Sequence, residues 1–179
     1  MIAVFLANGF EEIEALAVVD VLRRAGLEVV TVGIGSRTIR GSHNIPVVAD
    51  TTDEDWQPAG LEAVVLPGGM PGADNLEKSA VVQSAVDAVY AQGGYVCAIC
   101  AAPFILGHKG LLKGKKAICF PGYEAELTGA EIQDEAVVVD GHIITAKGAG
   151  VALDFGLRIV SCLTTEKTAA QLRAAMQCR

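Results

Sequence analysis

Short, almost wholly apolar runs alternate along this chain with segments of helical periodicity, and this alternation restricts the fold more than any other feature. Strands that are apolar at every position have both faces covered, as in a parallel sheet with helices on each side. The pattern predicts strands at 2–7, 28–32, 63–66, 95–99 and 116–119, a hairpin at 135–146 and a hairpin-like excursion at 36–50. Helices are expected at 11–25, 79–92, 101–108, 151–163 and 167–176. The sequence therefore predicts one α/β domain over residues 1–179, with a mostly parallel sheet and helices on both faces.

The composition narrows the range of partners and compartments. Of 179 residues, 14 are basic and 21 acidic, which gives a net charge of −7 without a basic cluster. Neither nucleic acid nor an anionic membrane surface is an expected partner for such a chain. No apolar run reaches the ~20 residues that span a bilayer, and Met1–Ala7 lacks the basic start of a signal peptide. Because five cysteines are an odd number, free thiols in a reducing cytoplasm are expected.

Cys100 stands where a predicted strand passes directly into a predicted helix, with Ala98 and Ala102 two positions away on either side. A sharp strand-to-helix turn leaves room only for small residues at those positions, as in a nucleophile elbow. The unpaired N–H groups and the positive end of the helix dipole would stabilise a thiolate there. We therefore expect a reactive thiol at Cys100. The alternative, a cysteine packed in the core between alanines, stays open on this pattern alone.

Glu14 is the expected carboxyl partner of Cys100. It lies one turn into the first helix, which follows the first strand and starts at the sheet edge where open α/β folds bind ligands. Ile13 and Leu16 are expected to face the core, which would let Glu14 lean toward the crevice of Cys100. A carboxyl buried beside a thiolate should be protonated, because two anions in a low dielectric repel each other. Glu14 would then donate a hydrogen bond to the sulfur.

The pair Gly68-Gly69 ends the strand predicted at 63–66. Glycines at such a position let backbone N–H groups approach a ligand oxygen. The N–H groups of Gly69 and Ala101 would together form an oxyanion hole. A plain turn without a further role is the alternative interpretation of the glycine pair.

The other cysteines and the histidines carry weaker signals. Cys97 and Cys100 have the spacing of a redox pair, but three residues along a strand separate their side chains by ~10 Å, too far for a disulfide. Cys97 is therefore expected in the core. His43 is a candidate for the rim of the crevice, because the excursion at 36–50 could fold over it. No Cys/His cluster has metal-ligand spacing and no phosphate loop is present, so we expect neither a metal nor a cofactor.

Segments spread over the whole chain resemble the ThiJ/PfpI superfamily, in the branch of the parkinsonism-associated protein deglycase (DJ-one) and bacterial ThiJ-type proteins. The matching segments are 11–14 (EEIE), 19–26 (VDVLRRAG), 65–76 (VLPGGMPGADNL), 98–103 (AICAAP), 144–150 (ITAKGAG) and 154–156 (DFG). The resemblance implies a flavodoxin-like three-layer sandwich and a homodimer. Carried over by position, Cys100 is the nucleophilic, oxidation-sensitive cysteine and Glu14 its protonated partner. Gly69 and Ala101 would supply the backbone N–H groups.

The resemblance also implies a function. Related proteins are linked to glutathione-independent glyoxalase activity, to repair of glycation adducts (deglycase activity) and to protection against oxidative stress, so the expected substrate is a small dicarbonyl or a glycated molecule. The alternatives are a non-catalytic redox sensor or chaperone-like protein and, less favoured, a PfpI-type cysteine peptidase. That peptidase branch has His directly after the cysteine, where this chain has Ala101. Some deglycase-branch members have His where this chain has Phe120, which removes one candidate general acid–base. Gly68, His43 and Phe120 are expected to line the substrate crevice.

Overall fold

The computed structural model describes residues 1–178. Its central sheet has seven strands in the order β10-β11-β7-β6-β1-β2-β5, and every neighbouring pair is parallel except β10 with β11. These strands are β1 (Ile2–Leu6), β2 (Val29–Gly33), β5 (Thr51–Thr52), β6 (Ala63–Leu66), β7 (Tyr95–Ile99), β10 (Val137–Asp140) and β11 (Ile143–Ala146). The expected α/β fold with a mostly parallel sheet is confirmed.

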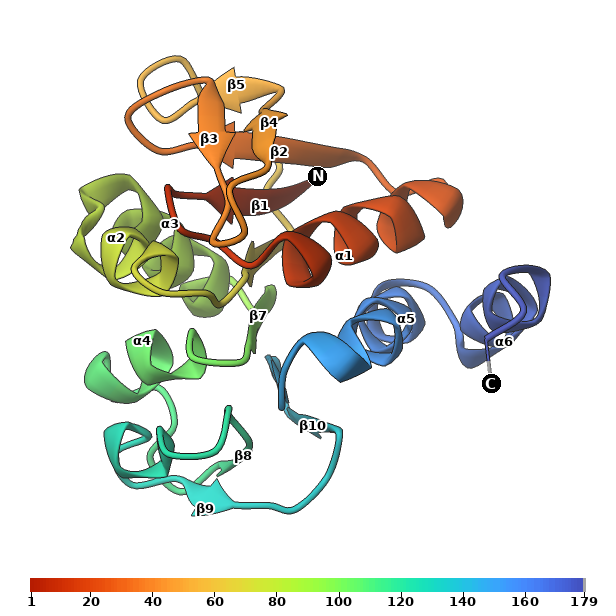
Figure 1. Cartoon of the computed structure of the whole chain (residues 1–179). Helices are drawn as coiled ribbons and strands as arrows, with labels where there is room; N and C mark the ends of the chain where they lie inside the picture. Colours follow the sequence, from red (N-terminus) through yellow and green to blue (C-terminus); the bar gives the residue numbers. More distant parts are fainter. Residues whose placement is uncertain (179) are drawn as a thin grey trace.

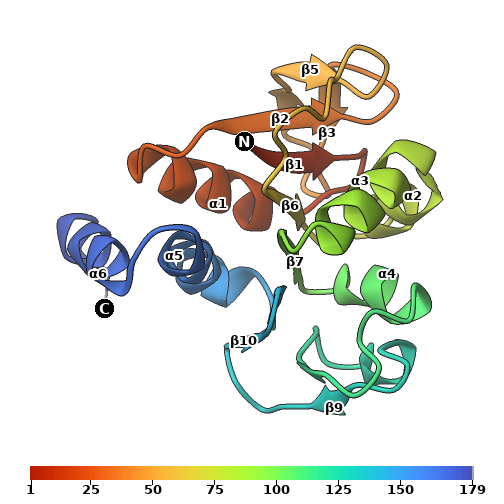
Figure 2. The same ribbon diagram turned by 180° about the vertical axis from the view of Figure 1, so that it is seen from behind.

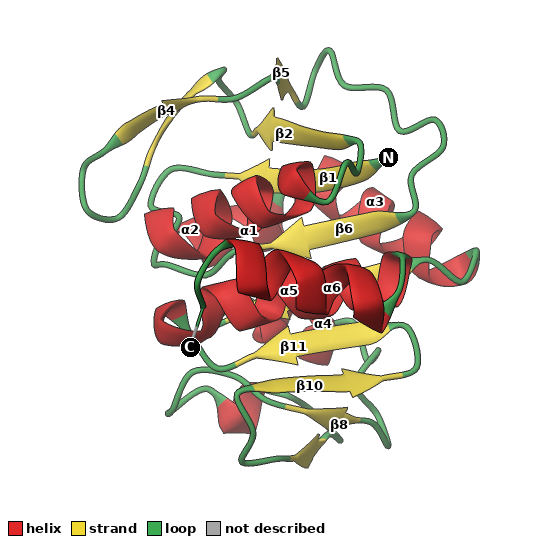
Figure 3. Cartoon of the chain, turned by 90° about the vertical axis from the view of Figure 1, so that its right-hand side faces the viewer, coloured by secondary structure: helices red, strands yellow, loops and turns green. Residues whose placement is uncertain are grey.

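Helices cover both faces of this sheet, as Figures 1 and 2 show from opposite sides. One face carries α1 (Glu12–Arg24), α5 (Ala152–Leu163) and α6 (Glu166–Ala175), which lie in front of the strands in Figure 3. The other face carries α2 (Gly72–Lys78), α3 (Ala80–Ala91) and α4 (Pro103–His108). None of the helices within residues 1–178 has the length and apolar character that crossing a bilayer requires.

The two helical layers enclose two apolar cores, one on each side of the sheet. Successive side chains of a strand point to opposite faces. Phe5 of β1 therefore packs into the core beneath α3, whereas its neighbours Val4 and Leu6 pack beneath α1 and α5. Burying a side chain of this size contributes about 1.5–3 kcal/mol, so strands that are apolar on both faces hold both helical layers. This is the physical reason why the alternation in the sequence predicts the fold.

Two small sheets lie outside the central one. The hairpin of β3 (Thr38–Arg40) and β4 (Pro46–Val48) corresponds to the predicted excursion, and it lies above the start of α1 in Figure 1. β8 (Lys116–Ala117) pairs with β9 (Glu131–Ile132), so the strand predicted at 116–119 is short and does not join the central sheet. Short 3-10 helices, η1 (Glu124–Glu126) and η2 (Ala149–Val151), complete the described elements.

Three sequence-based expectations about the helices are corrected. No helix is predicted between the strand at 63–66 and the helix at 79–92, but α2 (Gly72–Lys78) forms there, in a segment whose glycine and asparagine are poor helix formers. α4 starts at Pro103 rather than directly after Cys100. In α1, Ile13 and Leu16 are 57% and 37% exposed, so they do not face the core.

Candidate active site

Cys100 occupies the strained turn that leads from β7 toward α4. Its φ of 64° lies in the left-handed region, which a residue with a side chain rarely adopts. The turn is held by the Cys100 N–H, which donates to Ala146 O at 2.9 Å, and by the Ala102 N–H, which donates to Ile99 O at 3.1 Å. Cys100 O in turn accepts the Phe120 N–H at 2.8 Å. The predicted nucleophile-elbow geometry is therefore present, with Cys100 half-buried at the carboxyl end of the strand.

Glu14 is buried next to Cys100, with 1% of its surface exposed. Its Oε2 accepts the Gly68 N–H at 2.9 Å. Its Oε1 is buried and has no partner of ordinary hydrogen-bond geometry, but the carboxyl interacts with the Cys100 thiol. The placement of Glu14 was predicted, although for the wrong reason. Glu12 and Glu14 are themselves on the buried side of α1, together with Ala15, Val18 and Leu22, and the exposed positions are Ile13 and Leu16.

The glycine pair after β6 is required by close packing, which argues against a plain turn. A Cβ on Gly68 would lie 2.6 Å from the Cβ of Cys100 and 2.7 Å from Glu14 Oε2. Gly69 has a φ of 83° and would place a Cβ 2.4 Å from the Glu11 N atom. The backbone N–H groups of Ala101 and Gly69 both act on the Cys100 sulfur, where they lower the pKa of the thiol against the effect of burial. Two donors thus converge on the point where an oxyanion would form next to the sulfur.

Burial governs the ionisation of both groups. Burial raises the pKa of Glu14 to about 7, and the charge of Glu11 raises it further. The hydrogen bonds from Cys100 and Gly68 lower this pKa but offset only part of the rise. Burial, the charge of Glu14 and its hydrogen bond raise the pKa of the Cys100 thiol to about 12, and the N–H groups of Ala101 and Gly69 offset part of that rise. Because two anions cannot share this site, Cys100 and Glu14 hold two protons below about pH 7 and share one proton above it.

The expectation that a helix N-terminus lowers the pKa of Cys100 is therefore wrong. α4 has six residues and begins at Pro103, so its dipole is small and lies away from the thiol. How deeply Cys100 and Glu14 are buried could not be predicted from local sequence patterns, and burial has the largest effect on the pKa of both groups.

His43 lies at the end of the hairpin and pairs with carboxylates of α1. Its Nδ1 is 3.1 Å from Glu12 Oε2 and 3.2 Å from Glu11 Oε2, and its N–H donates to Glu12 Oε1 at 2.9 Å. The hydrogen bond to Glu12, followed by the charges of Glu11 and Glu12, raises the pKa of His43. His43 is thus placed near the start of α1, next to Glu11 and Glu12 rather than next to Cys100.

Glu11, Glu12 and His43 have ligand atoms within 4.8 Å of one another, close enough to share a cation. Sequence spacing missed this cluster, because the hairpin brings together residues 31 positions apart. When protonated, His43 is itself a cation beside these two carboxylates.

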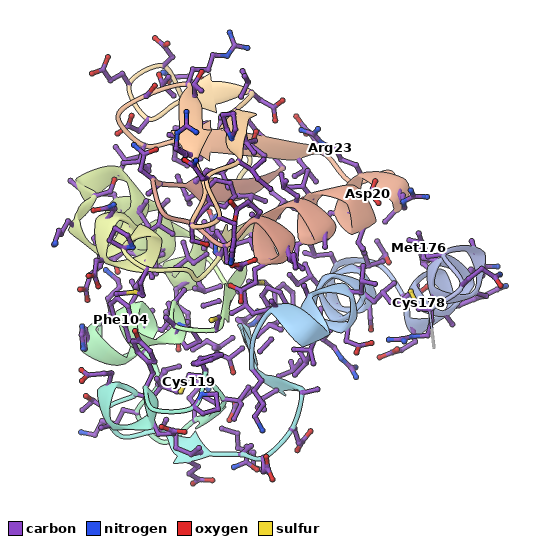
Figure 4. The ribbon with its side chains drawn as sticks, in the orientation of Figure 1. Asp20, Arg23, Phe104, Cys119, Met176 and Cys178 are labelled. Atoms are coloured by element: carbon purple, nitrogen blue, oxygen red, sulfur yellow. The ribbon has the colours of Figure 1, made fainter. Side chains whose placement is uncertain are left out.

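Phe120 and Gly148 lie together beside the Cys100 turn. Phe120 is 48% exposed, and a Cβ on Gly148 would lie 3.3 Å from the Phe120 ring. Cys119, which Figure 4 shows in the loop region near Phe104 of α4, is buried, and burial raises its pKa to about 11. Cys97 is fully buried in the core, as expected, and burial raises its pKa well above the ordinary value. Because thiolate is the reactive form, these two buried thiols are expected to be unreactive.

The positive φ of Cys100 gives this α/β chain a strand-to-helix elbow, the kind of turn on which many α/β proteins carry a nucleophile. Its carboxyl partner comes from the first helix and its N–H donors come from two different turns, so the site depends on the whole strand edge.

The chain belongs to the DJ-1/PfpI family, whose sequence pattern matches residues 1–162. It is 35% identical over 159 residues to Protein dj-1beta of Drosophila melanogaster, covering 87% of this chain and 85% of that protein. It is 31% identical over 166 residues to the glutathione-independent glyoxalase DJR-1.2 of Caenorhabditis elegans, covering 91% and 88%. It matches only 40% of the length of Protein DJ-1 homolog B of Arabidopsis thaliana.

Solved structures agree with this assignment. A DJ-1 superfamily protein of Salmonella typhimurium has 36% identity and a TM-score of 0.93, covering 98% of this chain and 97% of its own. An oxidized DJ-1 of Toxoplasma gondii has 32% identity and a TM-score of 0.94, with the same coverage. The flavodoxin-like fold implied by the sequence resemblance is confirmed.

Proposed function

We propose that this protein is a cysteine-dependent enzyme acting on small reactive dicarbonyls, of the glutathione-independent glyoxalase or deglycase type. The observation that carries the proposal is the strained Cys100 with Glu14 on one side and the N–H groups of Gly69 and Ala101 on the other. A nucleophile, a proton carrier and two oxyanion donors are the groups that addition to a carbonyl requires. A relative in C. elegans carries the name of this activity.

The reaction begins with the shared proton. When it moves from Cys100 to Glu14, the thiolate forms and adds to the aldehyde carbon of methylglyoxal. Gly69 and Ala101 hold the resulting oxyanion. Glu14 passes the proton it received from the thiol to this oxyanion and is again a carboxylate. It then removes the proton from the former aldehyde carbon and returns it to the neighbouring carbon, while the hydroxyl proton moves to the neighbouring oxygen, so that the first carbon is oxidised and the second reduced. Water hydrolyses the thioester, which releases lactate and restores the thiol. The sum is methylglyoxal plus water giving lactate and a proton, with no external oxidant or reductant.

Lactate formation from methylglyoxal by the purified protein, without glutathione, tests this proposal. Cys100→Ser should lower turnover at least a thousandfold, because the nucleophile is lost. Cys178→Ser is the matched control, since Cys178 follows α6 and lies apart from Cys119 and the loop region shown in Figure 4. Equal turnover in Cys100→Ser and Cys178→Ser would rule out a cysteine mechanism at this site.

A redox sensor is the second candidate function. Cys100 is the half-buried thiol at a strained turn, and one structural relative was solved in an oxidized state. Peroxide would oxidise the thiolate to sulfinic acid, and protonated Glu14 would donate a hydrogen bond to the new oxygen. Mild peroxide followed by intact-mass analysis tests this: the expected product carries two extra oxygens, about 32 Da, at Cys100. An unmodified Cys100 peptide would exclude the sensor.

A homodimer is the proposed assembly and the cytoplasm the proposed compartment. Exposed apolar side chains gather where α1 meets the hairpin: Ile13, Leu16, Ile45 and Val48. The Ile45 N–H reaches Glu12 Oε1 at 3.4 Å, which places this part of the hairpin against α1. A second copy covering this surface would remove it from water. Light scattering should give twice the mass of 18.6 kDa, and Ile13→Glu should return a monomer.

The five free cysteines agree with a reducing compartment.

A further inference from the structure

His108 ends α4, and both of its ring nitrogens meet a carboxylate. Nδ1 is 2.5 Å from Glu77 Oε1 of α2, and Nε2 is 2.9 Å from Glu126 Oε2 of η1. Figure 1 shows α4 between α2 and the segment of β8 and β9, which includes η1. One side chain thus joins three elements. We call His108 with these two carboxylates the His108 clamp.

The His108 clamp requires the imidazolium. A carboxylate only accepts hydrogen bonds, so both ring nitrogens have to donate, whereas a neutral ring has a single N–H. The hydrogen bonds to Glu126 and Glu77, with the charges of both carboxylates, raise the pKa of His108 against the effect of burial. The stabilisation is therefore complete below the ordinary pKa of 6.5 and is lost as the pH rises through the raised, folded value.

The charges that act on His108 within residues 1–178 are those of Glu77 and Glu126. Lys109, the next residue, pairs with Asp87 of α3 at 2.8 Å. The remaining titratable side chains of the packed elements and loop are Asp74, Lys78, Cys119, Tyr123 and Glu124. None of these five shifts the pKa of His108, so the protonation of the ring depends on its two partners.

The loop that carries Glu126 also carries Phe120, which borders the Cys100 turn. Successive backbone hydrogen bonds connect them: the Glu126 N–H donates to Tyr123 O at 3.0 Å, and the Tyr123 N–H donates to Phe120 O at 3.1 Å. The Phe120 N–H then donates to Cys100 O at 2.8 Å. The loop also packs tightly on α4, since a Cβ on Gly107 would overlap Glu126 O. A contact that holds Glu126 against α4 therefore also positions Phe120.

A row of aromatic rings connects the same two parts of the chain. Phe104, labelled on α4 in Figure 4, lies between His108 and Tyr123, with ring centroids 5.3 Å and 6.3 Å away. A cation within about 6 Å of an aromatic ring is attracted to its face. The protonated ring of His108 is thus favoured by the aromatic row as well as by the two carboxylates.

We propose that the imidazolium of His108 is a positioning residue: it clamps the loop 119–127 to α4 and α2, holds Phe120 beside Cys100, and releases the loop when the ring loses its proton. The neutral ring keeps Glu77, whose contact is shorter and whose side chain is 31% exposed, and frees Glu126, which is 54% exposed. The effect on substrate rests on the proposed function, whereas the hold on the loop does not.

Amide exchange tests the clamp without any turnover. Protection of the Tyr123 and Glu126 amides, corrected for intrinsic exchange, should fall about threefold from pH 6 to pH 9 in the wild type, because exposed ion pairs are weak. His108→Gln should show the lower protection at both pH values. His108→Arg keeps a charge and several donors at both, so it should show the higher protection throughout. Cys100→Ser should behave like the wild type, which excludes the Cys100–Glu14 pair as the cause.

Lys109→Gln is the matched control, because Lys109 contacts α3 rather than the loop, and it should keep the pH dependence of the wild type. Equal protection in His108→Gln and Lys109→Gln would overturn the proposal. Protection in the wild type that does not change with pH, or His108→Arg behaving like His108→Gln, would overturn it too.

Kinetics test the link to the active site. At pH 6, His108→Gln should raise the KM for methylglyoxal about threefold with kcat nearly unchanged, and His108→Arg should restore it. Comparison at one pH leaves the ionisation of Cys100 and Glu14 the same in every variant. An unchanged KM in His108→Gln would overturn the positioning role. A wild type without turnover but with the expected amide pattern would refute the proposed function and support the clamp.

Discussion

Glu14 and Gly68 are joined by a hydrogen bond of 2.9 Å in which the Gly68 N–H donates to Glu14 Oε2. This bond ties the first helix to the turn after β6 and leaves Oε1 as the carboxyl oxygen available to the Cys100 thiol. The same glycine lies so close to the Cβ of Cys100 that no side chain fits. One backbone position therefore sets the distance between the nucleophile and its proton partner.

Gly68→Ala should disrupt the site. The added methyl group would lie 2.6 Å from the Cys100 Cβ and 2.7 Å from Glu14 Oε2, so one of the two must move. We expect a loss of about 1–3 kcal/mol in the free energy of unfolding and at least a hundredfold loss of turnover. Gly150→Ala is the matched control, because nothing lies within 4 Å of its added methyl group. Urea unfolding and lactate assays measure both effects; equal values for the two variants would contradict the packing described here.

Glu14→Gln should change how stability depends on pH. The pKa of Glu14 is about 7 in the folded protein against 4.5 ordinarily, so the folded state holds this proton more tightly. The resulting stabilisation is present below pH 4.5 and is lost as the pH rises to about 7, and it amounts to roughly 3 kcal/mol. Glutamine has no such proton. The unfolding free energy of the variant should therefore gain about 3 kcal/mol on the wild type between pH 4 and pH 8. A constant difference would contradict the raised pKa.

Glu12→Ala should loosen the hairpin. Glu12 accepts the N–H groups of His43 and Ile45, and although burial raises its pKa, the hydrogen bonds to its carboxylate lower it overall. We expect amide exchange of His43 and Ile45 to accelerate at least tenfold. Glu28→Ala, an exposed glutamate, is the control and should leave both amides unchanged.

The pairing of Glu12 with His43 also predicts a pH window. The lowered pKa of Glu12 means that its contribution is present above pH 4.5 and lost as the pH falls. The raised pKa of His43 means that its contribution is present below pH 6.5 and lost as the pH rises through its folded value. Protection of the hairpin amides, corrected for intrinsic exchange, should therefore be greatest between about pH 4.5 and 6.5. Protection that rises steadily to pH 8 would show that the imidazolium does not hold the hairpin.

Phe120→His should raise dicarbonyl turnover. Phe120 lies beside the Cys100 turn, and its N–H donates to Cys100 O, so an imidazole there could exchange protons with the substrate. General acid–base groups contribute about 10²–10⁴ in rate, and even a poorly placed one should give about tenfold. Phe120→Leu is the control for the loss of the ring. Lactate assays should show the gain only in the histidine variant; no gain would mean that Glu14 alone suffices.

Most of the fold could be predicted because a strand that is buried on both faces is apolar at nearly every position, and such runs can be recognised in the sequence. The strand Tyr95–Ile99 and the hairpin at Asp140-Gly141 follow from local patterns alone. α2 could not be predicted in this way, since Gly72 and Asn75 are poor helix formers and tertiary packing of Ala73 and Leu76 stabilises the helix. The edge strand β5 has two residues, too few for any periodicity.

The candidate site was predicted in its membership but not in its energetics. Cys100, Gly68 and Gly69 follow strands of the sheet, and Glu14 lies in the first turn of the helix after β1, so topology brings all four to one edge. The face of α1 that was predicted to be buried is wrong, because Glu12 and Glu14 are buried against hydrogen-bond partners that are distant in sequence, His43 and Gly68. The two carboxylates of the His108 clamp are likewise visible only in three dimensions.

The shared proton of Cys100 and Glu14 is tested most directly by the rate of Cys100 alkylation with iodoacetamide as a function of pH, followed at the peptide level. The wild type should show a first rise near pH 7, where the pair loses its first proton, and a second rise only toward pH 12. Glu14→Gln should lose the rise near pH 7 and show one ionisation, below the wild type's upper step, because the charge of Glu14 no longer raises the pKa of the thiol. A rise near pH 7 that persists in Glu14→Gln would contradict the shared proton.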